Sequence, residues 1–180
     1  EGHNIWLSFD RADLPVYQDY LLKPVPNHYC FDLGKGYEVE LVWMPGHDSG
    51  HAMFLDHGGR RLIAGDDICS DVISCGSGGK AGDPYRRYCT VEAYRSELSV
   101  LCGRLSEFDY IFPGHFMVNL ENSLLPDILS TLNAILLAPG DFDYRTETPG
   151  GSGQPPQVRM FRQIPGFSVI AYTEDGVYLR

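Results

Sequence analysis

Basic residues are scarce in this chain of 180 residues. It contains 14 Lys and Arg against 24 Asp and Glu, so its formal net charge at pH 7 is -10. Nucleic acids and anionic membranes are bound through clustered basic residues, and this composition argues against both partners. The chain also lacks long apolar runs, because stretches such as 134–139 are far shorter than the ~20 residues of a membrane span. We therefore expect a protein that binds neither nucleic acid nor a membrane.

Cysteine is also sparse, and its spacing is irregular. An odd number of cysteines without a CxxC pair argues against a disulfide framework or a zinc ribbon. The five are Cys30, Cys69, Cys75, Cys89 and Cys102. We expect reduced thiols and a cytoplasmic location. Cys69 and Cys75 have no basic neighbour in sequence, so we expect buried, neutral thiols there rather than nucleophiles or metal ligands.

The hydrophobic patterns predict one mixed α and β domain over residues 1–180. Period-two alternation and short apolar runs predict strands, and apolar residues three and four apart predict helices. The expected strands are 38–44, 52–55, 62–64, 109–112, 167–172 and 177–179, and the expected helices are 91–105, capped by Thr90, and 125–137. Turns at 56–59 and 173–176 predict two hairpins. A Gly- and Pro-rich stretch, 148–157, is expected to be a flexible connection.

Three of the expected strands end in the same way, with a glycine followed by a residue that can bind metal. His47 follows Pro45-Gly46, Asp66 follows Gly65, and His115 follows Pro113-Gly114. The composition predicts about 0.04 copies of Pro-Gly-His, and the chain has two. Imidazole nitrogen and carboxylate oxygen suit zinc or iron. The alternative is that the histidines are turn residues and Asp66 caps a helix, but three matched placements favour a shared site.

These segments resemble a known family. Residues 44–51 (MPGHDSGH) resemble the TPGHTxGH segment of the metallo-β-lactamase superfamily, most closely as it occurs in glyoxalase II-like hydrolases. Residues 62–66 (LIAGD) resemble the LFTGD segment, and residues 111–115 (IFPGH) resemble the later PGH segment. The order and the spacing of the three segments also match.

The resemblance implies an α+β fold, the metallo-β-lactamase αββα sandwich of two facing sheets covered by helices. It implies that His47 binds one metal ion, that His115 binds a second, and that Asp66 bridges both as the catalytic carboxylate. The metal would be zinc, with iron or manganese as alternatives. Zinc lowers the pKa of its bound water to about 7 and polarises the oxygen under attack.

The sequence departs from the family pattern upstream of these segments. Family members carry an HxHxDH motif that supplies the remaining metal ligands, and no HxH occurs in these 180 residues. The motif would belong before Glu1, so we expect an incomplete, later portion of the domain. A cleaved product, one piece of a split enzyme and a partial domain all remain open. Three ligands serving one zinc ion also remain open.

The resemblance assigns weaker roles to residues between the Asp66 and His115 motifs. Lys80, Tyr85, Arg86 and Arg87 are the candidate substrate contacts, with ordinary surface charge as the alternative for each. A glutathione thioester is disfavoured, because Phe116 stands where glyoxalase II enzymes have a polar residue. His51 is expected to be structural or to support a ligand, and Asp67 to be a solvated loop carboxylate, with support of a ligand as its alternative.

The function that these patterns favour is metal-dependent hydrolysis of a small ester, thioester, lactone or related small-molecule substrate. The alternative is a catalytically silent scaffold or interaction module that retains remnants of the site. An uncovered sheet face would favour a homo-oligomer or binding of a complementing N-terminal segment.

Overall fold

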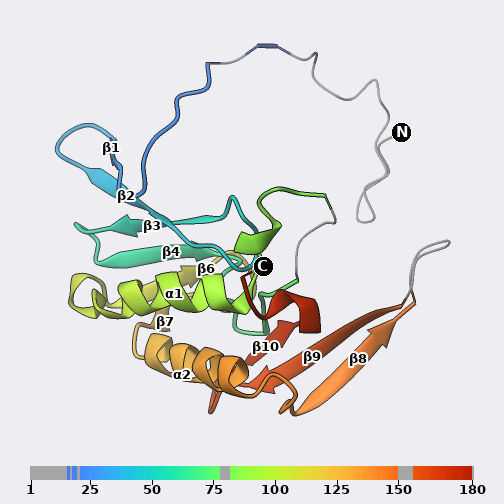
Figure 1. The fold of residues 1–180 in the computed structure, drawn as a ribbon. Coiled ribbons are helices and arrows are strands. Elements are labelled where there is room, and N and C mark those ends of the chain that lie inside the picture. Colours follow the sequence, from blue (N-terminus) through green and yellow to red (C-terminus); the bar gives the residue numbers. More distant parts are fainter. Residues whose placement is uncertain (1–15, 17, 20, 78–81, 150–155, 180) are drawn as a thin grey trace.

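The computed structural model describes residues 16, 18–19, 21–77, 82–149 and 156–179. Two sheets and two helices make up this part of the chain (Figure 1). The helices are α1 (Val91–Cys102) and α2 (Leu124–Leu137), and short 3-10 turns are η2 (Arg86–Tyr88), η3 (Leu105–Glu107) and η4 (Glu174–Gly176). No helix in the described ranges is both long and apolar enough to cross a membrane.

The larger sheet has six strands. Their order across the sheet is β1 (Cys30–Asp32), β2 (Glu38–Trp43), β3 (Ala52–Asp56), β4 (Arg61–Gly65), β6 (Tyr110–Pro113) and β7 (Leu120–Glu121). β2 is antiparallel to β3, β3 is antiparallel to β4, and β4 is parallel to β6. β2, β4 and β6 therefore run in one direction, and their carboxyl ends lie at the same edge of the sheet.

The smaller sheet has four strands, and the end of the chain contributes three of them. Their order is β5 (Val72–Ser74), β10 (Val169–Tyr172), β9 (Gln157–Gln163) and β8 (Tyr144–Thr148). β5 pairs in parallel with β10, whereas β9 is antiparallel to both β10 and β8. Because β5 follows directly from the end of β4, the smaller sheet is tied to the same edge of the larger one.

Helix α1 begins where the sequence predicts. The side chain of Thr90 caps it, because Oγ1 accepts a hydrogen bond from the backbone N–H of Ala93 at 3.2 Å. Tyr94, Leu98 and Leu101 are fully buried on its inner face. The helix ends at Cys102, three residues before the predicted end, and Leu105 begins η3 instead.

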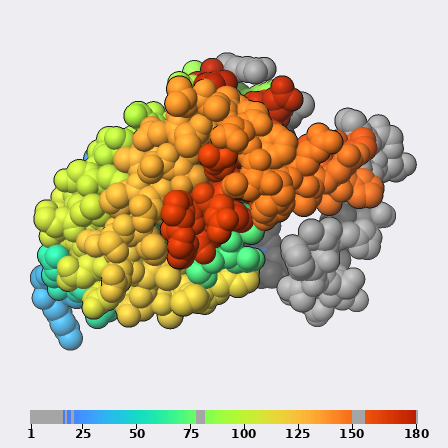
Figure 2. All heavy atoms as spheres, turned by 90° about the horizontal axis from the view of Figure 1, so that it is seen from below, coloured from blue at the N-terminus to red at the C-terminus, as the bar shows by residue number. Residues whose placement is uncertain are grey.

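Helix α2 lies beside α1, and both helices lie on one side of the larger sheet (Figure 1). Seen from below, the two helices form adjoining surfaces, and β8 projects away from them (Figure 2). The buried residues of α2 share one hydrophobic core with those of α1 and of the strands; they are Leu125, Ile128, Leu132 and Ile135. This core supplies the main stabilisation of the helices, since isolated helices of 12 to 14 residues are marginal in water.

The buried face of β2 is not the face that carries the alternating apolar residues of its sequence. Glu40 and Val42 point into the core side of the sheet, while Val39, Leu41 and Trp43 are only half-buried. The alternation therefore predicts the strand correctly but not the face that is covered. Glu40 tolerates burial because basic groups pair with it, as described below.

The face of the larger sheet that points away from the helices carries an apolar stripe. Its members stand opposite one another in register across four strands; they are Leu41, Phe54, Ile63 and Phe112. The side chain of Ile63 is 44% exposed, and the other three are half-buried. Among the described elements, no helix covers this face (Figure 1).

The predicted hairpin at the end of the chain is wrong. Residues 177–179 form no strand, and 174–176 form the turn η4. β10 already has β5 on one side and β9 on the other, so it has no free edge for a strand at 177–179. Instead, the carbonyl of Val177 accepts a hydrogen bond from the N–H of Glu92, which ties the end of the chain to α1.

A hairpin that was not predicted from the sequence lies earlier in the chain. β8 and β9 pair in register from Tyr144 opposite Phe161 to Thr148 opposite Gln157, with the two rings of the first pair stacked 4.5 Å apart. The Gly- and Pro-rich stretch predicted at 148–157 joins these strands, and its residues 150–155 lie outside the described residues. The exposed, polar sequence of β8 gives no alternation that would reveal a strand.

Candidate metal centre

The edge at which β2, β4 and β6 end brings three predicted ligands together. His47 lies four residues after β2, Asp66 directly after β4, and His115 two residues after β6. Nε2 of His47 lies 3.7 Å from Oδ2 of Asp66, and Nε2 of His115 lies 3.2 Å from Oδ1 of Asp66. The predicted convergence of residues 68 positions apart is confirmed.

The geometry of these three side chains fits a carboxylate between two metal ions. The two histidines face different oxygens of Asp66. Two ligand atoms bound to one tetrahedral zinc ion through bonds of ~2.1 Å lie about 3.4 Å apart. The two observed nitrogen–oxygen distances, 3.7 and 3.2 Å, lie on either side of this value. No single oxygen of Asp66 brings all three donors within 4.8 Å of one another, which disfavours one ion held by all three. All three side chains retain access to solvent.

His47 is held in the orientation that a metal ligand needs. Its Nδ1 lies 2.8 Å from the backbone carbonyl of Ser74, at the end of β5. A carbonyl only accepts hydrogen bonds, so Nδ1 carries the proton, and in the neutral ring Nε2 presents its lone pair toward Asp66. The smaller sheet thereby fixes the tautomer of a side chain that belongs to the larger one.

Glycine is required where the chain turns toward the candidate ligands. Gly46 has a φ of +123°, and a Cβ there would lie 2.4 Å from Cβ of Tyr94. Gly65 has a φ of +55°, and a Cβ there would lie 2.6 Å from the ring of His51. Both glycines allow a close approach that no other residue permits, as the sequence predicts for the positions before His47 and Asp66.

His51 supports the backbone at Asp66. Its Nε2 accepts a hydrogen bond from the N–H of Asp66 at 3.2 Å, and its Nδ1 lies 2.5 Å from Oδ2 of Asp67. The carboxylate of Asp67 raises the pKa of the His51 ring. The predicted structural or supporting role of His51 is consistent with these contacts.

Asp67 is not the solvated loop carboxylate that the sequence analysis expects. Its side chain is fully buried, and burial raises the pKa of its carboxyl to about 6 despite the opposing effect of His51. Tyr94 of α1 donates a hydrogen bond to the carbonyl of Asp67 at 2.6 Å. The backbone carbonyl of Asp67 therefore has a hydrogen-bond partner in the core, and its carboxylate lies against the ring of His51.

The cysteines near the candidate centre are buried, as predicted. All five cysteines lie in described residues and are free thiols. Burial raises the pKa of Cys69 to about 11 and raises that of Cys75 further. Neither thiol is therefore suited to act as a thiolate nucleophile near neutral pH.

The predicted substrate contacts are not joined to the three candidate ligands by any described contact. Arg86 lies 4.0 Å from Asp175, and the backbone N–H of Tyr85 donates to Asp83. Arg87 donates to the hydroxyl of Tyr88 and stacks over its ring. Lys80 lies outside the described residues. A role for these side chains in substrate binding stays a prediction.

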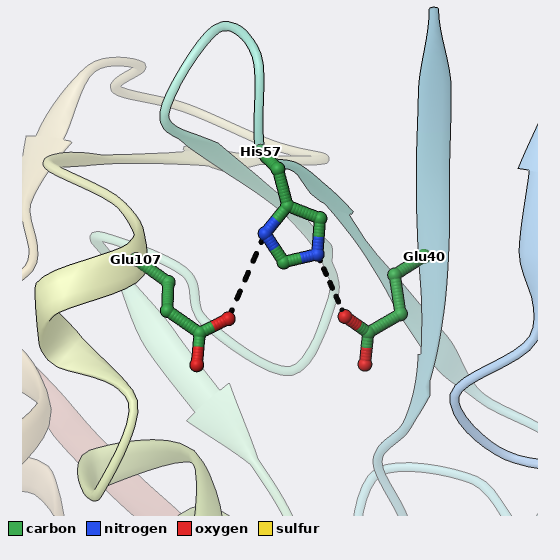
Figure 3. Close-up of side chains that lie close together, drawn as sticks. All are labelled: Glu40, His57 and Glu107. Atoms are coloured by element: carbon green, nitrogen blue, oxygen red, sulfur yellow. Dashed lines mark hydrogen bonds and ion pairs between the residues drawn. The ribbon is translucent and has the colours of Figure 1, made fainter.

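A second cluster of possible metal ligands lies elsewhere in the structure. Glu40 of β2, His57 of the β3–β4 turn and Glu107 of η3 place one donor atom each within 4.8 Å of one another (Figure 3). Nε2 of His57 lies 2.8 Å from Glu40, and its Nδ1 lies 3.6 Å from Glu107. This cluster could not be predicted from the sequence, because its members come from three elements and share no motif.

Arg104 occupies the cation position of this second cluster. Its guanidinium donates two hydrogen bonds to Glu40, at 2.7 and 2.8 Å, and two to Glu107, at 2.7 and 2.9 Å. His28 adds a contact of 2.6 Å to Glu40, and these partners hold the pKa of the Glu40 carboxyl at about 2. Arg104 thus pairs with both glutamates, and the arrangement is better suited to a partly buried ion-pair network than to a metal ion.

Two cavities in the described part of the chain are lined by residues of neither cluster. One of about 410 Å³ is lined by the loop after α2 and by β8, β9 and η4, including Phe142, Arg145 and Glu174. Another of about 120 Å³ lies between Trp43 and Tyr88. Neither is lined by His47, Asp66 or His115.

No family model matches the sequence, and no curated protein matches it. Solved structures do resemble its fold. A metallo-β-lactamase family protein from Thermus thermophilus is 21% identical with a TM-score of 0.50, and the match covers 67% of this chain and 38% of that protein. A metallo-β-lactamase from Pontibacter korlensis is 18% identical with a TM-score of 0.43, covering 61% and 47%. An archaeal superfamily protein from Sulfolobus tokodaii is 19% identical with a TM-score of 0.41, covering 70% and 43%.

The chain has the metallo-β-lactamase fold, an α+β arrangement, over the part that it shares with the Thermus protein. At this identity the likeness concerns the fold alone. The match spans less than half the length of each neighbour. The three sequence segments that resemble the superfamily occupy the ends of β2, β4 and β6, where the candidate ligands converge.

Proposed function

We propose that His47, Asp66 and His115 form part of the dinuclear zinc centre of a hydrolase that acts on a small ester, thioester, lactone or related substrate. The observation that carries this proposal is the placement of Asp66, whose two oxygens face Nε2 of two different histidines. His47 would hold one ion, His115 the other, and Asp66 would bridge them. Iron or manganese suits the same donors.

The protein residues have three tasks in this proposal. In the neutral ring of His47, Nε2 is unprotonated because the proton is on Nδ1, which donates it in a hydrogen bond to the carbonyl of Ser74. His51 holds the backbone at Asp66, which orients the bridging carboxylate. Tyr85, Arg86 and Lys80 are the proposed substrate contacts. When bound, zinc would supply a water with a pKa near 7 and would polarise the carbonyl under attack.

The number of donors implies further ligands. One histidine and one shared carboxylate give each ion two protein donors, whereas zinc sites have three or four. We propose that a segment carrying HxHxDH, outside these 180 residues, supplies the rest. The low donor count also favours the second candidate, a catalytically silent scaffold that retains part of the site. Metal binding distinguishes the two.

Zinc titration of the full chain by calorimetry tests the proposal. We expect weak binding that is lost in Asp66→Asn and that strengthens when a segment carrying HxHxDH is added. Asp71→Asn is the matched control, since Asp71 is an exposed carboxylate five residues away. Equal zinc binding by the wild-type chain and by Asp66→Asn would overturn the proposed metal centre and favour the silent scaffold.

A further inference from the structure

Three consecutive large apolar side chains are exposed directly after His115. Phe116 is 69% exposed, Met117 is 65% exposed and Val118 is 61% exposed. Single exposed apolar residues are ordinary, but a contiguous apolar patch on a protein surface marks a place of binding. The chain has 24 acidic residues, and this exposed apolar run lies next to the charged and polar side chains of the candidate metal centre.

The backbone holds this loop in its outward conformation. Phe116 has a φ of +65° and Asn119 a φ of +63°, a region that a bulky aromatic residue adopts rarely. The N–H of Met117 donates to Oγ of Ser70 at 3.0 Å, and the N–H of Gly114 donates to the carbonyl of Gly65 at 2.8 Å. The loop is thus fastened to the segments on both sides of Asp66, and its side chains still point outward. Burial of the apolar groups within this chain does not explain that conformation.

The apolar surface begins where the candidate metal ligands end. The rings of His115 and Phe116 have centroids 6.0 Å apart, and Nε2 of His115 lies 3.2 Å from Asp66. Binding sites for small molecules combine a few placed polar groups with an apolar lining. Here the polar groups would receive the reacting carbonyl, and the adjoining apolar residues can cover a hydrocarbon group attached to it.

We propose that Phe116, Met117 and Val118 bind the hydrocarbon part of an acyl substrate whose carbonyl reacts at the adjoining metal centre. This inference rests on the proposed function and narrows its substrate class to esters, thioesters or lactones whose acyl part is a hydrocarbon chain. An anionic membrane fits less well as occupant, because the chain carries a net charge of -10. A second copy of the chain bound at this loop is the remaining competitor, and the experiment separates it.

The test measures chain-length preference without requiring turnover. Methyl butyrate and methyl octanoate, kept below the concentrations at which they aggregate, are titrated into the ¹⁵N-labelled full chain, and amide shifts give the two dissociation constants. Complete burial of one methylene group strengthens binding about fourfold, and burial of half of its surface strengthens binding about twofold. For four additional methylenes we expect tighter binding of the octanoate ester by about tenfold or more, with shifts at residues 116–119 and at Ser70.

Two substitutions remove the apolar side chains separately. Phe116→Asn keeps a residue that tolerates positive φ, and Met117→Ser keeps the N–H that bonds Ser70. Each substitution should reduce the preference for methyl octanoate over methyl butyrate to below about threefold. Leu137→Ser, which removes an 88% exposed apolar side chain from the end of α2, should leave it unchanged. Dispersed amide spectra check that each variant is folded.

The outcomes separate this inference from the proposed function. An unchanged preference in both loop variants, or shifts elsewhere in the chain, overturns the inference even where zinc binding depends on Asp66. A preference that persists without zinc and is lost in the loop variants supports the acyl site even where the zinc titration fails. Loop variants that abolish self-association without changing ester binding overturn it in favour of a contact between two copies.

Discussion

The buried carboxylate of Asp67 lies against the ring of His51, with Oδ2 of Asp67 2.5 Å from Nδ1 of His51. The other ring nitrogen of His51 accepts the backbone N–H of Asp66. This pair therefore connects a fully buried charge to the backbone of the proposed bridging ligand. It lies beneath the candidate metal centre and contributes no ligand in our proposal.

We expect His51→Ala to lower the free energy of unfolding by about 3 kcal/mol, because it leaves the buried carboxylate of Asp67 without the imidazole that lies against it. Asp67→Asn removes the charge at nearly constant volume and should cost about 1 kcal/mol. Urea denaturation followed by circular dichroism measures both. Asp71→Asn, at an exposed carboxylate, should change the value by less than about 0.5 kcal/mol. A His51→Ala variant as stable as the wild type would show that the pair is not a stabilising contact.

Arg104 should be more important for stability than an exposed arginine. Arg104→Met leaves Glu40, which is 6% exposed, with only His28 and His57 as partners, and we expect a loss of about 3 kcal/mol. Arg60→Met is the matched control, since Arg60 pairs with Asp109 at the surface, where such pairs contribute about 0.5 kcal/mol. Equal losses in the two variants, measured by urea denaturation at pH 6, would contradict this expectation.

The same network predicts a dependence of stability on pH. The pKa of the Glu40 carboxyl is lowered from its ordinary 4.5 to about 2, chiefly by the hydrogen bonds from Arg104. A lowered pKa in the folded state means that the stabilisation is fully present above pH 4.5 and is lost as the pH falls toward 2. Urea midpoints at pH 6, 4 and 3 should fall more steeply for the wild type than for Arg104→Met. If the urea midpoints of the wild type and of Arg104→Met fall equally with pH, Glu40 does not have this role.

Gly46 and Gly82 offer a matched pair for testing the turn before His47. Both have positive φ, but a Cβ at Gly46 would meet Tyr94 at 2.4 Å, whereas a Cβ at Gly82 would meet nothing within 4 Å. We expect Gly46→Ala to cost about 3 kcal/mol and to weaken zinc binding, and Gly82→Ala to cost about 1 kcal/mol. Thermal denaturation and zinc calorimetry provide the two measurements. Similar stability of the two variants would argue against close packing at Gly46.

The apolar stripe on the larger sheet predicts self-association. A sheet face that carries Leu41, Phe54, Ile63 and Phe112, and that no helix of the described ranges covers, favours pairing with a second copy of the chain. We expect sedimentation velocity to show a concentration-dependent dimer that Ile63→Lys disrupts. Leu137→Lys, at an exposed position on α2, should have no effect. A monomer at all concentrations that binds no apolar dye would disprove the prediction.

Much of the fold could be predicted from local patterns in the sequence. The strands β2, β3, β4 and β6, and both helices, lie within a few residues of the predicted ranges, because each has a clear period or a clear stop signal. β8 and β9 could not be predicted, since every residue of β8 is exposed and its sequence shows no alternation. The end of the chain was predicted wrongly because a hairpin turn signal at 173–176 is local, while the strands beside β10 come from elsewhere in the sequence.

The candidate site likewise combines features that the local sequence predicts with features that only the tertiary structure decides. The Pro-Gly-His repeats and the Gly-Asp segment specify which residues are ligand-type and which backbone turns precede them, because these are properties of adjacent residues. Tertiary structure decided that two histidines face opposite oxygens of Asp66, that Ser74 fixes the His47 tautomer, and that Asp67 is buried. It also placed Arg104 between Glu40 and Glu107. These relationships depend on the parallel alignment of β2, β4 and β6 and on the docking of β5, which join segments far apart in the chain, and no local pattern encodes the distance between them.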